Sequence, residues 1–221
     1  MRILLHSATR LEVEPLLSHF EEVAADEYRF HDHRIKLLIS GVGMMATAYH
    51  LGKRLAIEEF DLAINVGICG SLEDKTEVGQ AVFAATDQAI EEGAEDGEQW
   101  LSLEKMKLRA SDDFPYEEGR LRSSLAERLA GELDVPLKQA ISVNRVLGAA
   151  SSIVKVKRHS KAEIVSMEGA AFYFSCLMKG LACLQVRAIS NRVEERNRAA
   201  WRVEMALANL TSTLLKVLKH V

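Results

Sequence analysis

The stretch SMEGAAFYFSCLMKGLACLQVRAIS, residues 166–190, decides how the chain folds. Residues 166–180 are nearly all apolar, which predicts a buried helix that ends at Gly180. Residues 182–190 form a short apolar run, which is typical of a strand buried on both faces. A buried helix that leads into a buried strand indicates a sheet covered by helices.

The rest of the chain repeats this alternation of short apolar runs and helix-period stretches. The apolar runs predict strands over 2–8, 34–40, 61–67 and 80–86, and a strand followed by a turn over 139–149. Helical spacing predicts helices after the first strand, over 44–58 and 119–131, and from about 199. No internal repeat, low-complexity tract or linker interrupts the pattern, so we predict one α/β domain over 1–221 with a mainly parallel sheet.

The composition is that of an ordinary globular protein. The 221 residues are 48% hydrophobic and 27% charged, with a net charge of -4, so one core can form without disulfides or metal. No basic stripe is present to neutralise phosphates, and we expect no nucleic-acid partner. No apolar run reaches transmembrane length, and residues 1–9 lead directly into a strand instead of a signal peptide. These features predict a cytoplasmic protein without a membrane partner.

The three cysteines lie in apolar surroundings: Cys69, Cys176 and Cys183. Their odd number and the lack of a Cys-x-x-Cys or Cys/His cluster predict buried thiols in a reducing compartment. We therefore expect no metal site and no cofactor.

Glycines stand where two predicted strands turn into loops, in SGVG (40–43) and NVGICGS (65–71). Such turns let the backbone approach a ligand closely, and they also fit plain tight turns. Neither is a dinucleotide-binding or Walker loop. The acidic run EEGAEDGE (91–98) predicts an exposed loop, with a lid over the active site as the alternative.

Three carboxylates are candidates for chemistry. Glu168 begins the apolar helix, where an unpaired carboxylate is costly, although the helix N-terminus favours its charge. Arg187 on the next strand is a suitable counter-charge. Glu168 fits either a structural acid or an acceptor for ligand hydroxyls, and Glu12 and Glu14 fit either helix-initial acids or catalytic ones.

Taken together, these stretches resemble the nucleoside phosphorylase and nucleosidase superfamily. SGVG, NVGICGS, SMEGAA and RAISN follow the order and spacing of that family over nearly the whole chain. The resemblance implies a three-layer α/β/α sandwich around a mixed, partly barrel-like sheet. It also implies cleavage of the N-glycosidic bond of nucleosides by a homo-oligomer, for which we expect a dimer.

The resemblance also implies roles for individual residues. Glu168 would bind the ribose hydroxyls, with Met167 against the ribose and Arg187 orienting Glu168. Glu12 would activate water, with Glu14 as its rival. In SVNRVLG (142–148) the family encloses the base, which makes Val143, Asn144 and Arg145 binding candidates, together with Gly70. Arg145 departs from the family, where a small hydroxyl residue is expected.

The charges at the glycine turns favour hydrolysis over phosphorolysis. Phosphorylases of this family carry arginines there, whereas here Met44 and Met45 follow the first turn and the second holds no Arg or Lys. Holding phosphate without a cation is costly, so water is the expected nucleophile.

Asn191 stands where nucleosidases acting on methylthioadenosine or adenosylhomocysteine have an Asp that protonates the adenine. An amide cannot act as a general acid, but it can donate a hydrogen bond to O6 or N7 of a 6-oxopurine. Asn191 therefore predicts a hypoxanthine-like base.

One branch of the family combines these features. SMEGAAF and ISNRVEERNRAAW resemble futalosine hydrolases, which release hypoxanthine from futalosine in menaquinone biosynthesis. One of Arg192, Arg196 and Arg198 would then meet a carboxylate on the 5′ side of the substrate. The alternatives are a methylthioadenosine/adenosylhomocysteine nucleosidase, a purine nucleoside phosphorylase, and a nucleoside-binding protein without activity.

Overall fold

The central sheet is built around strands that are buried on both faces. β1 (Arg2–Ser7), β5 (Leu62–Ser71) and β12 (Cys183–Arg192) are buried along most of their length. In the computed structural model, which describes all of residues 1–221, β5 pairs in parallel with β1 on one side and with β12 on the other. Because side chains alternate between the two faces of a strand, each face of the sheet needs its own cover.

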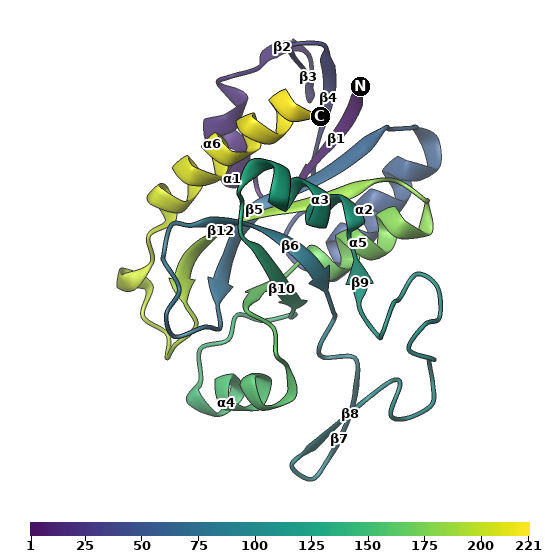
Figure 1. Cartoon of the computed structure of the whole chain (residues 1–221), viewed down its shortest axis with the longest axis vertical. Helices are drawn as coiled ribbons and strands as arrows, with labels where there is room; N and C mark the ends of the chain where they lie inside the picture. Colours follow the sequence, from purple (N-terminus) through teal and green to yellow (C-terminus); the bar gives the residue numbers. More distant parts are fainter.

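Helices cover both faces and produce three layers (Figure 1). On one face, α1 (Arg10–Leu17), α3 (Ser124–Leu133) and α6 (Val203–His220) enclose the larger apolar core. On the other face, α2 (Met44–Ile57) and α5 (Gly169–Met178) enclose a second core. The structure thus confirms the predicted α/β/α sandwich with a mixed central sheet.

The remaining strands complete one ten-stranded sheet in the order β11-β10-β6-β12-β5-β1-β4-β3-β2, with β9 paired to β6. Their bounds are β2 (Glu21–Ala24), β3 (Glu27–Phe30), β4 (His33–Ile39), β6 (Ala81–Asp87), β9 (Leu121–Arg122), β10 (Leu137–Ser142) and β11 (Ile164–Ser166). β12 is antiparallel to β6, and β11 returns to pair with the end of β5. This last pairing closes five strands into a ring, which is the expected barrel-like part of the sheet.

The end of β5 differs from its prediction. Residues 68–71 were expected to form a turn, but they continue the strand to Ser71. The reason is tertiary: β12 pairs with this glycine-containing segment on one side and β11 on the other. Pairing with β11 and β12 keeps this segment extended. The local sequence pattern does not indicate that pairing.

Other differences lie in polar segments. The β2–β3 meander, β11 and α4 (Ala150–His159) were not predicted, because β2, β3 and α4 lack a clear apolar pattern and β11 is very short. The predicted helix over 119–131 begins only at Ser124, because the Ser123 hydroxyl accepts a hydrogen bond from the Ala126 N–H (3.0 Å). The last helix begins at Val203, after a short 3-10 turn over Arg198–Ala200.

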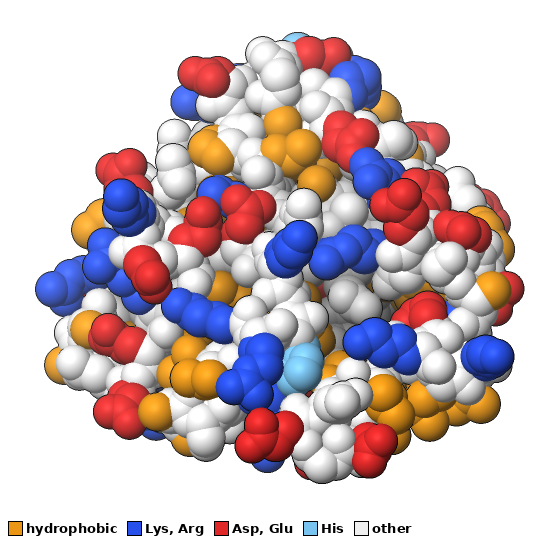
Figure 2. Space-filling view, turned by 60° about the horizontal axis from the view of Figure 1, so that its bottom comes forward, with side chains coloured by type: hydrophobic (Ala, Val, Ile, Leu, Met, Phe, Trp, Pro, Cys, Tyr) orange, Lys and Arg blue, Asp and Glu red, His pale blue; other side chains and the backbone are white.

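The acidic run 91–98 belongs to a two-stranded hairpin instead of a loop. β7 (Gly93–Asp96) and β8 (Gln99–Ser102) pair only with each other and extend from the sheet beside α4 (Figure 1). The predicted exposure of the run is confirmed, because six of its eight residues are exposed and none is buried. Basic and acidic side chains are mixed over the face seen in Figure 2. No helix of the structure is both long and apolar enough to span a membrane.

Candidate active site

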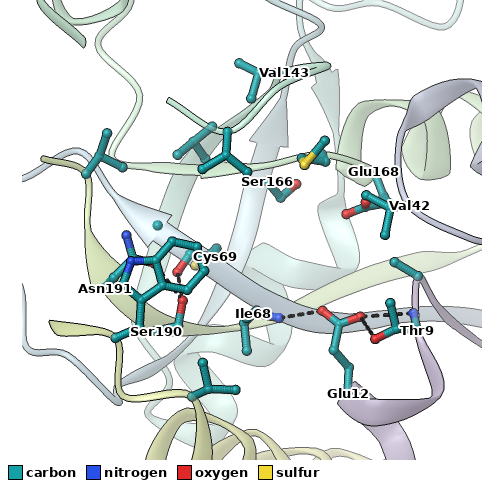
Figure 3. A pocket seen from close by; sticks show the side chains of 18 of the residues that line it. Thr9, Glu12, Val42, Ile68, Cys69, Val143, Ser166, Glu168, Ser190 and Asn191 are labelled. Carbon is teal, nitrogen blue, oxygen red and sulfur yellow. Dashed lines mark hydrogen bonds between the residues drawn. The ribbon is translucent and has the colours of Figure 1, made fainter. Parts of the chain in front are cut away.

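A cavity of about 250 Å³ opens where the carboxyl ends of β1, β5, β10, β11 and β12 meet (Figure 3). Open α/β sheets bind ligands at this edge. Two thirds of the lining residues are hydrophobic, and the only charged side chains among them are Glu12 and Glu168. The cavity is therefore an apolar chamber with two carboxylates and no cation.

Glu12 is held in the first turn of α1 by four donors. Its Oε2 accepts hydrogen bonds from the Thr9 N–H (3.1 Å), the Thr9 hydroxyl (3.0 Å) and the Ser7 hydroxyl (3.2 Å). Its Oε1 accepts only the Ile68 N–H (3.1 Å) (Figure 3). A carboxylate oxygen has two lone pairs, so Oε1 keeps one for a ligand or a water molecule.

Glu14 points away from the cavity. It forms an ion pair with Arg10 (2.8 Å), and 60% of its side chain is exposed. The sequence left Glu12 and Glu14 as rivals, and the structure brings only Glu12 to the cavity. The helix makes the choice, because residues two apart on a helix face different directions.

Glu168 lies across the cavity from Glu12 (Figure 3) and is only 6% exposed. Its Oε1 accepts a hydrogen bond from the Gly43 N–H (2.9 Å), just before the first turn of α2. Burial raises the pKa of Glu168, and the positive charge of Arg187 lowers it. Glu168 therefore does not cap its own helix, but binds to the N-terminal end of another one.

Arg187 does not contact Glu168, which corrects its predicted direct role in the site. It is 2% exposed and forms no ion pair or hydrogen bond with Glu168, and it does not line the cavity. Its Nε and Nη2 donate to Gln185 Oε1 (3.2 and 3.1 Å), and Nη2 also donates to Asn65 Oδ1. Arg187 therefore acts on Glu168 through its charge, from beneath the cavity.

Gly67 lies between Arg187 and Glu12 and lets both side chains approach the same point. A Cβ atom at this position would lie 2.7 Å from Arg187 Nη1 and 2.7 Å from Glu12 Oε1. The guanidinium and the carboxylate therefore approach the same point of β5, and only a residue without a side chain leaves room for both.

A β-bulge in β12 directs Ser190 and Asn191 into the cavity. Ile189 pairs with Cys69 and Asn191 pairs with Gly70, so Ser190 is the extra residue. The predicted strand ended at residue 190, before Asn191, but β12 continues to Arg192 because β5 continues beside it.

The Asn191 amide is held on both sides. The Ser190 hydroxyl donates to Asn191 Oδ1 (2.8 Å), and Asn191 Nδ2 donates to the Arg192 carbonyl (2.8 Å). One N–H of the amide group has no bond within the protein. Asn191 thus presents a hydrogen-bond donor to a ligand.

The remaining predicted binding residues divide into two groups. Met167, Gly70 and Val143 line the cavity, whereas Asn144 and Arg145 do not. The Asn144 N–H donates to Glu91 (2.7 Å), and Arg145 lines a separate cavity of about 90 Å³ beside the hairpin. The structure therefore does not bring Asn144 and Arg145 to the main cavity.

The segment that leads into α6 also contributes to the cavity, a role that the sequence motifs did not indicate. Trp201, Val203 and Leu207 line the cavity. The segment folds back over the bulge, because the Arg202 N–H donates to the Ser190 carbonyl (2.8 Å). A lone tryptophan in a charged stretch was the only signal of this role.

Cys69 lines the cavity without being a nucleophile. Burial raises the pKa of its thiol to about 12, against the charge of Arg187, so the thiol stays protonated. This agrees with its interpretation as a packing residue. No three His, Cys, Asp or Glu side chains lie together in an arrangement that could hold a metal ion.

The chain is similar to known proteins along its whole length. A family model described as the phosphorylase superfamily matches residues 2–220. A futalosine hydrolase of Thermus thermophilus is 28% identical over 186 residues, which are 82% of this chain and 80% of the relative. A futalosine hydrolase of Streptomyces coelicolor is 28% identical over 159 residues, which are 72% of this chain and 65% of the relative.

Solved structures share the fold. A futalosine hydrolase mutant of Helicobacter pylori strain 26695 matches with a TM-score of 0.80 at 18% identity, over 100% of both chains. A 5′-methylthioadenosine/S-adenosylhomocysteine nucleosidase of Neisseria meningitidis matches with a TM-score of 0.80 at 20% identity, over 100% of this chain and 99% of the other. At these identities the likeness shows the fold alone.

The close approach at Gly67 is tested by a pair of glycine substitutions. We expect Gly67→Ala to lower the free energy of unfolding by about 1–3 kcal/mol, because its Cβ displaces Arg187 or Glu12. Gly52→Ala, in α2 with no atom within 4 Å of the new Cβ, should raise it by about 0.5–1 kcal/mol. Urea denaturation measures both. Equal effects of the two substitutions would contradict the crowding at Gly67.

Proposed function

The chain belongs to the phosphorylase superfamily, and we propose that within it the protein hydrolyses the N-glycosidic bond of futalosine and releases hypoxanthine. The main support is the charge of the cavity, where Glu12 and Glu168 are present and Lys, Arg and His are absent. The names of the relatives that are 28% identical provide independent support.

The charge of the cavity favours water over phosphate as the nucleophile. A phosphate dianion would have to lie near two carboxylates, in an apolar chamber that offers it no cation. Water carries no charge and therefore avoids this cost. Glu12 is the proposed base that activates it, through the lone pair that remains on Oε1.

The two carboxylates also suit the charge that develops on the sugar. As the base departs, the ribosyl carbon gains oxocarbenium character, which a nearby negative charge stabilises. In our proposal, Glu168 accepts hydrogen bonds from the ribose hydroxyls while its other contact, the Gly43 N–H, keeps it in place. Met167 and Trp201 provide apolar surface against the substrate.

Asn191 is the residue that we propose selects the purine base of the substrate. Its free N–H is a donor, and a 6-oxopurine offers acceptors at O6 and N7. An adenine would bring its own 6-amino donor toward the same amide. The second candidate, a methylthioadenosine/adenosylhomocysteine nucleosidase, is favoured by the shared fold alone.

The reaction is proposed to take place in the cytoplasm, in a dimer. Residues 1–221 act as one nucleosidase domain in menaquinone biosynthesis in the cytoplasm, where three buried free cysteines suit a reducing environment. Val42, just before α2, and Met45 and Tyr49, near the start of α2, are 57%, 87% and 64% exposed. Such an apolar surface beside the cavity supports a dimer with a second copy of this chain.

One assay tests the substrate, the nucleophile and the role of Glu12 as the general base. We expect hypoxanthine release from futalosine, little release from inosine and no release of adenine from methylthioadenosine, with rates that do not depend on phosphate. Glu12→Gln should lower kcat at least about 100-fold, because the amide cannot take a proton from water. Chromatography of the free bases measures the rates.

Glu14→Gln is the matched control, since the same change two residues away alters only an exposed ion pair. Its kcat should equal that of the unmodified protein. Release of adenine alone, or turnover only with phosphate, would contradict the proposed function. Equal losses in the two variants would contradict the assignment of Glu12.

Asn191→Asp tests whether Asn191 selects the purine base of the substrate. The carboxyl group loses the N–H donor and gains the ability to protonate a base. We expect the ratio of kcat/KM for hypoxanthine nucleosides over adenine nucleosides to fall at least about tenfold. Competition between the two substrates in one reaction gives this ratio. An unchanged ratio would remove the support from Asn191 while leaving hydrolysis itself intact.

Met45→Glu tests the proposed dimer. A carboxylate in an apolar interface would be buried without a partner, so we expect the variant to sediment as a monomer. Val154→Glu, on α4 with 55% exposure, is the control and should remain dimeric. Sedimentation equilibrium measures the mass of each. A monomeric unmodified protein would contradict this part of the proposal.

A further inference from the structure

A buried chain of polar side chains runs beneath the cavity and is not explained by substrate binding. Asp87 at the end of β6 and Gln185 on β12 are both 0% exposed, and Arg187 beside them is 2% exposed. Gln185 Nε2 donates to Asp87 Oδ2 (3.1 Å), and Gln185 Oε1 accepts from Arg187. We call these three residues the Asp87 relay.

The direction of the relay follows from its chemistry. A guanidinium has only donors, so the amide of Gln185 must turn its oxygen toward Arg187. Its NH2 group must then face acceptors, and the two that it finds are Asp87 and the Gly169 carbonyl (3.1 Å). An ionised carboxylate is a pure acceptor, so it holds the amide in this orientation.

The second oxygen of Asp87 connects the relay to the rest of the site. Asp87 Oδ1 accepts hydrogen bonds from the Ser142 hydroxyl (3.0 Å) and the Gln88 N–H (2.8 Å). The Ser142 hydroxyl in turn accepts the Ala170 N–H (2.8 Å). Asp87 thereby joins β12, the end of β10 before Val143, and the start of α5 after Glu168.

Asp87 and Gln185 are packed tightly against Gly169. A Cβ atom on Gly169 would collide with both Asp87 and Gln185. The two side chains therefore press directly on the backbone of the residue that follows Glu168. A change of their orientation must move Arg187, this backbone, or both.

We propose that Asp87 is a positioning residue for the nucleosidase reaction: its negative charge orients the Gln185 amide, which holds the Arg187 guanidinium beneath Glu12 and Glu168. The inference rests on the proposed function, since the reaction provides one of its readouts. Asp87 does not line the cavity, so it acts only through the relay.

The titration of Asp87 gives the relay a pH dependence. Burial raises the pKa of Asp87 to about 6, against the hydrogen bond from Gln185 and the charge of Arg187. The groups that face it are Arg187 and Gln185 from β12, Ser142 from β10, and Tyr173 and the first residues of α5. Burial raises the pKa of Tyr173 well above its usual value, so Arg187 is the only charge among them.

The hydrogen bonds determine in which direction pH acts on the relay. Above pH 6 Asp87 is ionised, and the relay is complete. As the pH falls through about 6, Asp87 gains a proton and loses its negative charge, and a proton on Oδ2 makes it a donor toward Gln185. The amide then meets donors at both ends, and if it turns its oxygen toward Asp87, Arg187 loses the Gln185 acceptor and keeps only Asn65.

The first test compares kcat from pH 5 to pH 8 for the unmodified protein and Asp87→Asn. The unmodified protein should lose kcat below about pH 6 with the uptake of one proton. In Asp87→Asn, the new NH2 group imitates the protonated state at every pH. We expect its kcat at pH 8 to fall at least about tenfold, without the loss centred on pH 6.

Asp74→Asn is the matched control, because it makes the same chemical change at an exposed ion pair with Lys157. Its pH profile should equal that of the unmodified protein. Gln185→Leu removes the amide that connects Asp87 to Arg187 and leaves Asp87 itself unchanged. Its kcat at pH 8 should fall as in Asp87→Asn. The proposal is wrong if Asp87→Asn and Gln185→Leu keep full kcat at pH 8 and still lose kcat below about pH 6 as the unmodified protein does. This holds whatever the stability of the two variants.

A second readout does not need the substrate. The Nε–H of Arg187 donates to Gln185, so its NMR resonance should shift with a midpoint near pH 6, and Asp87→Asn should abolish this shift. A protein that cleaves none of the nucleosides but shows this titration would refute the proposed function and retain the relay. A resonance that does not change between pH 5 and pH 8 would refute the relay.

Discussion

The rest of the site depends on one constraint, the burial of the Arg187 guanidinium within the sheet. A buried cation must find acceptors for its donors and negative charge nearby. The neighbouring histidine cannot share this task or add to the charge, since burial, and then Arg187 itself, lowers the pKa of His6 to about 3. Neutral amides, Gln185 and Asn65, accept the hydrogen bonds. The compensating charges are Asp87 below and the carboxylates of the cavity above.

This arrangement explains how an apolar cavity keeps two carboxylates. Glu12 and Glu168 are each held by backbone N–H donors, and the cation beneath them lowers the pKa of Glu168 against the effect of burial. Without Arg187, burial would favour the protonated form of Glu168 more strongly. The same charge balance leaves no cation in the cavity itself, which is why it suits a neutral nucleophile and the positive character of a ribosyl transition state.

Backbone geometry brings these groups together. The parallel strands end at one edge, where Gly67 lets Arg187 and Glu12 approach the same point and the bulge at Ser190 turns Asn191 toward the cavity. Gly169 allows Asp87 and Gln185 to pack against the start of α5. Each glycine is thus a place where two functional groups would otherwise collide with a side chain.

The sequence by itself determined the layers, the main strands and helices, and the candidates Glu12, Glu168 and Asn191, because apolar periodicity and short motifs are local properties. Only the tertiary structure brought Glu12 rather than Glu14 to the cavity, separated Arg187 from Glu168 and placed Arg145 beside a different cavity. Only it revealed the relay, in which Gln185 and Asp87 are 98 residues apart along the chain. A hydrogen bond between distant strands depends on how the sheet pairs, and no local pattern of residues records that pairing.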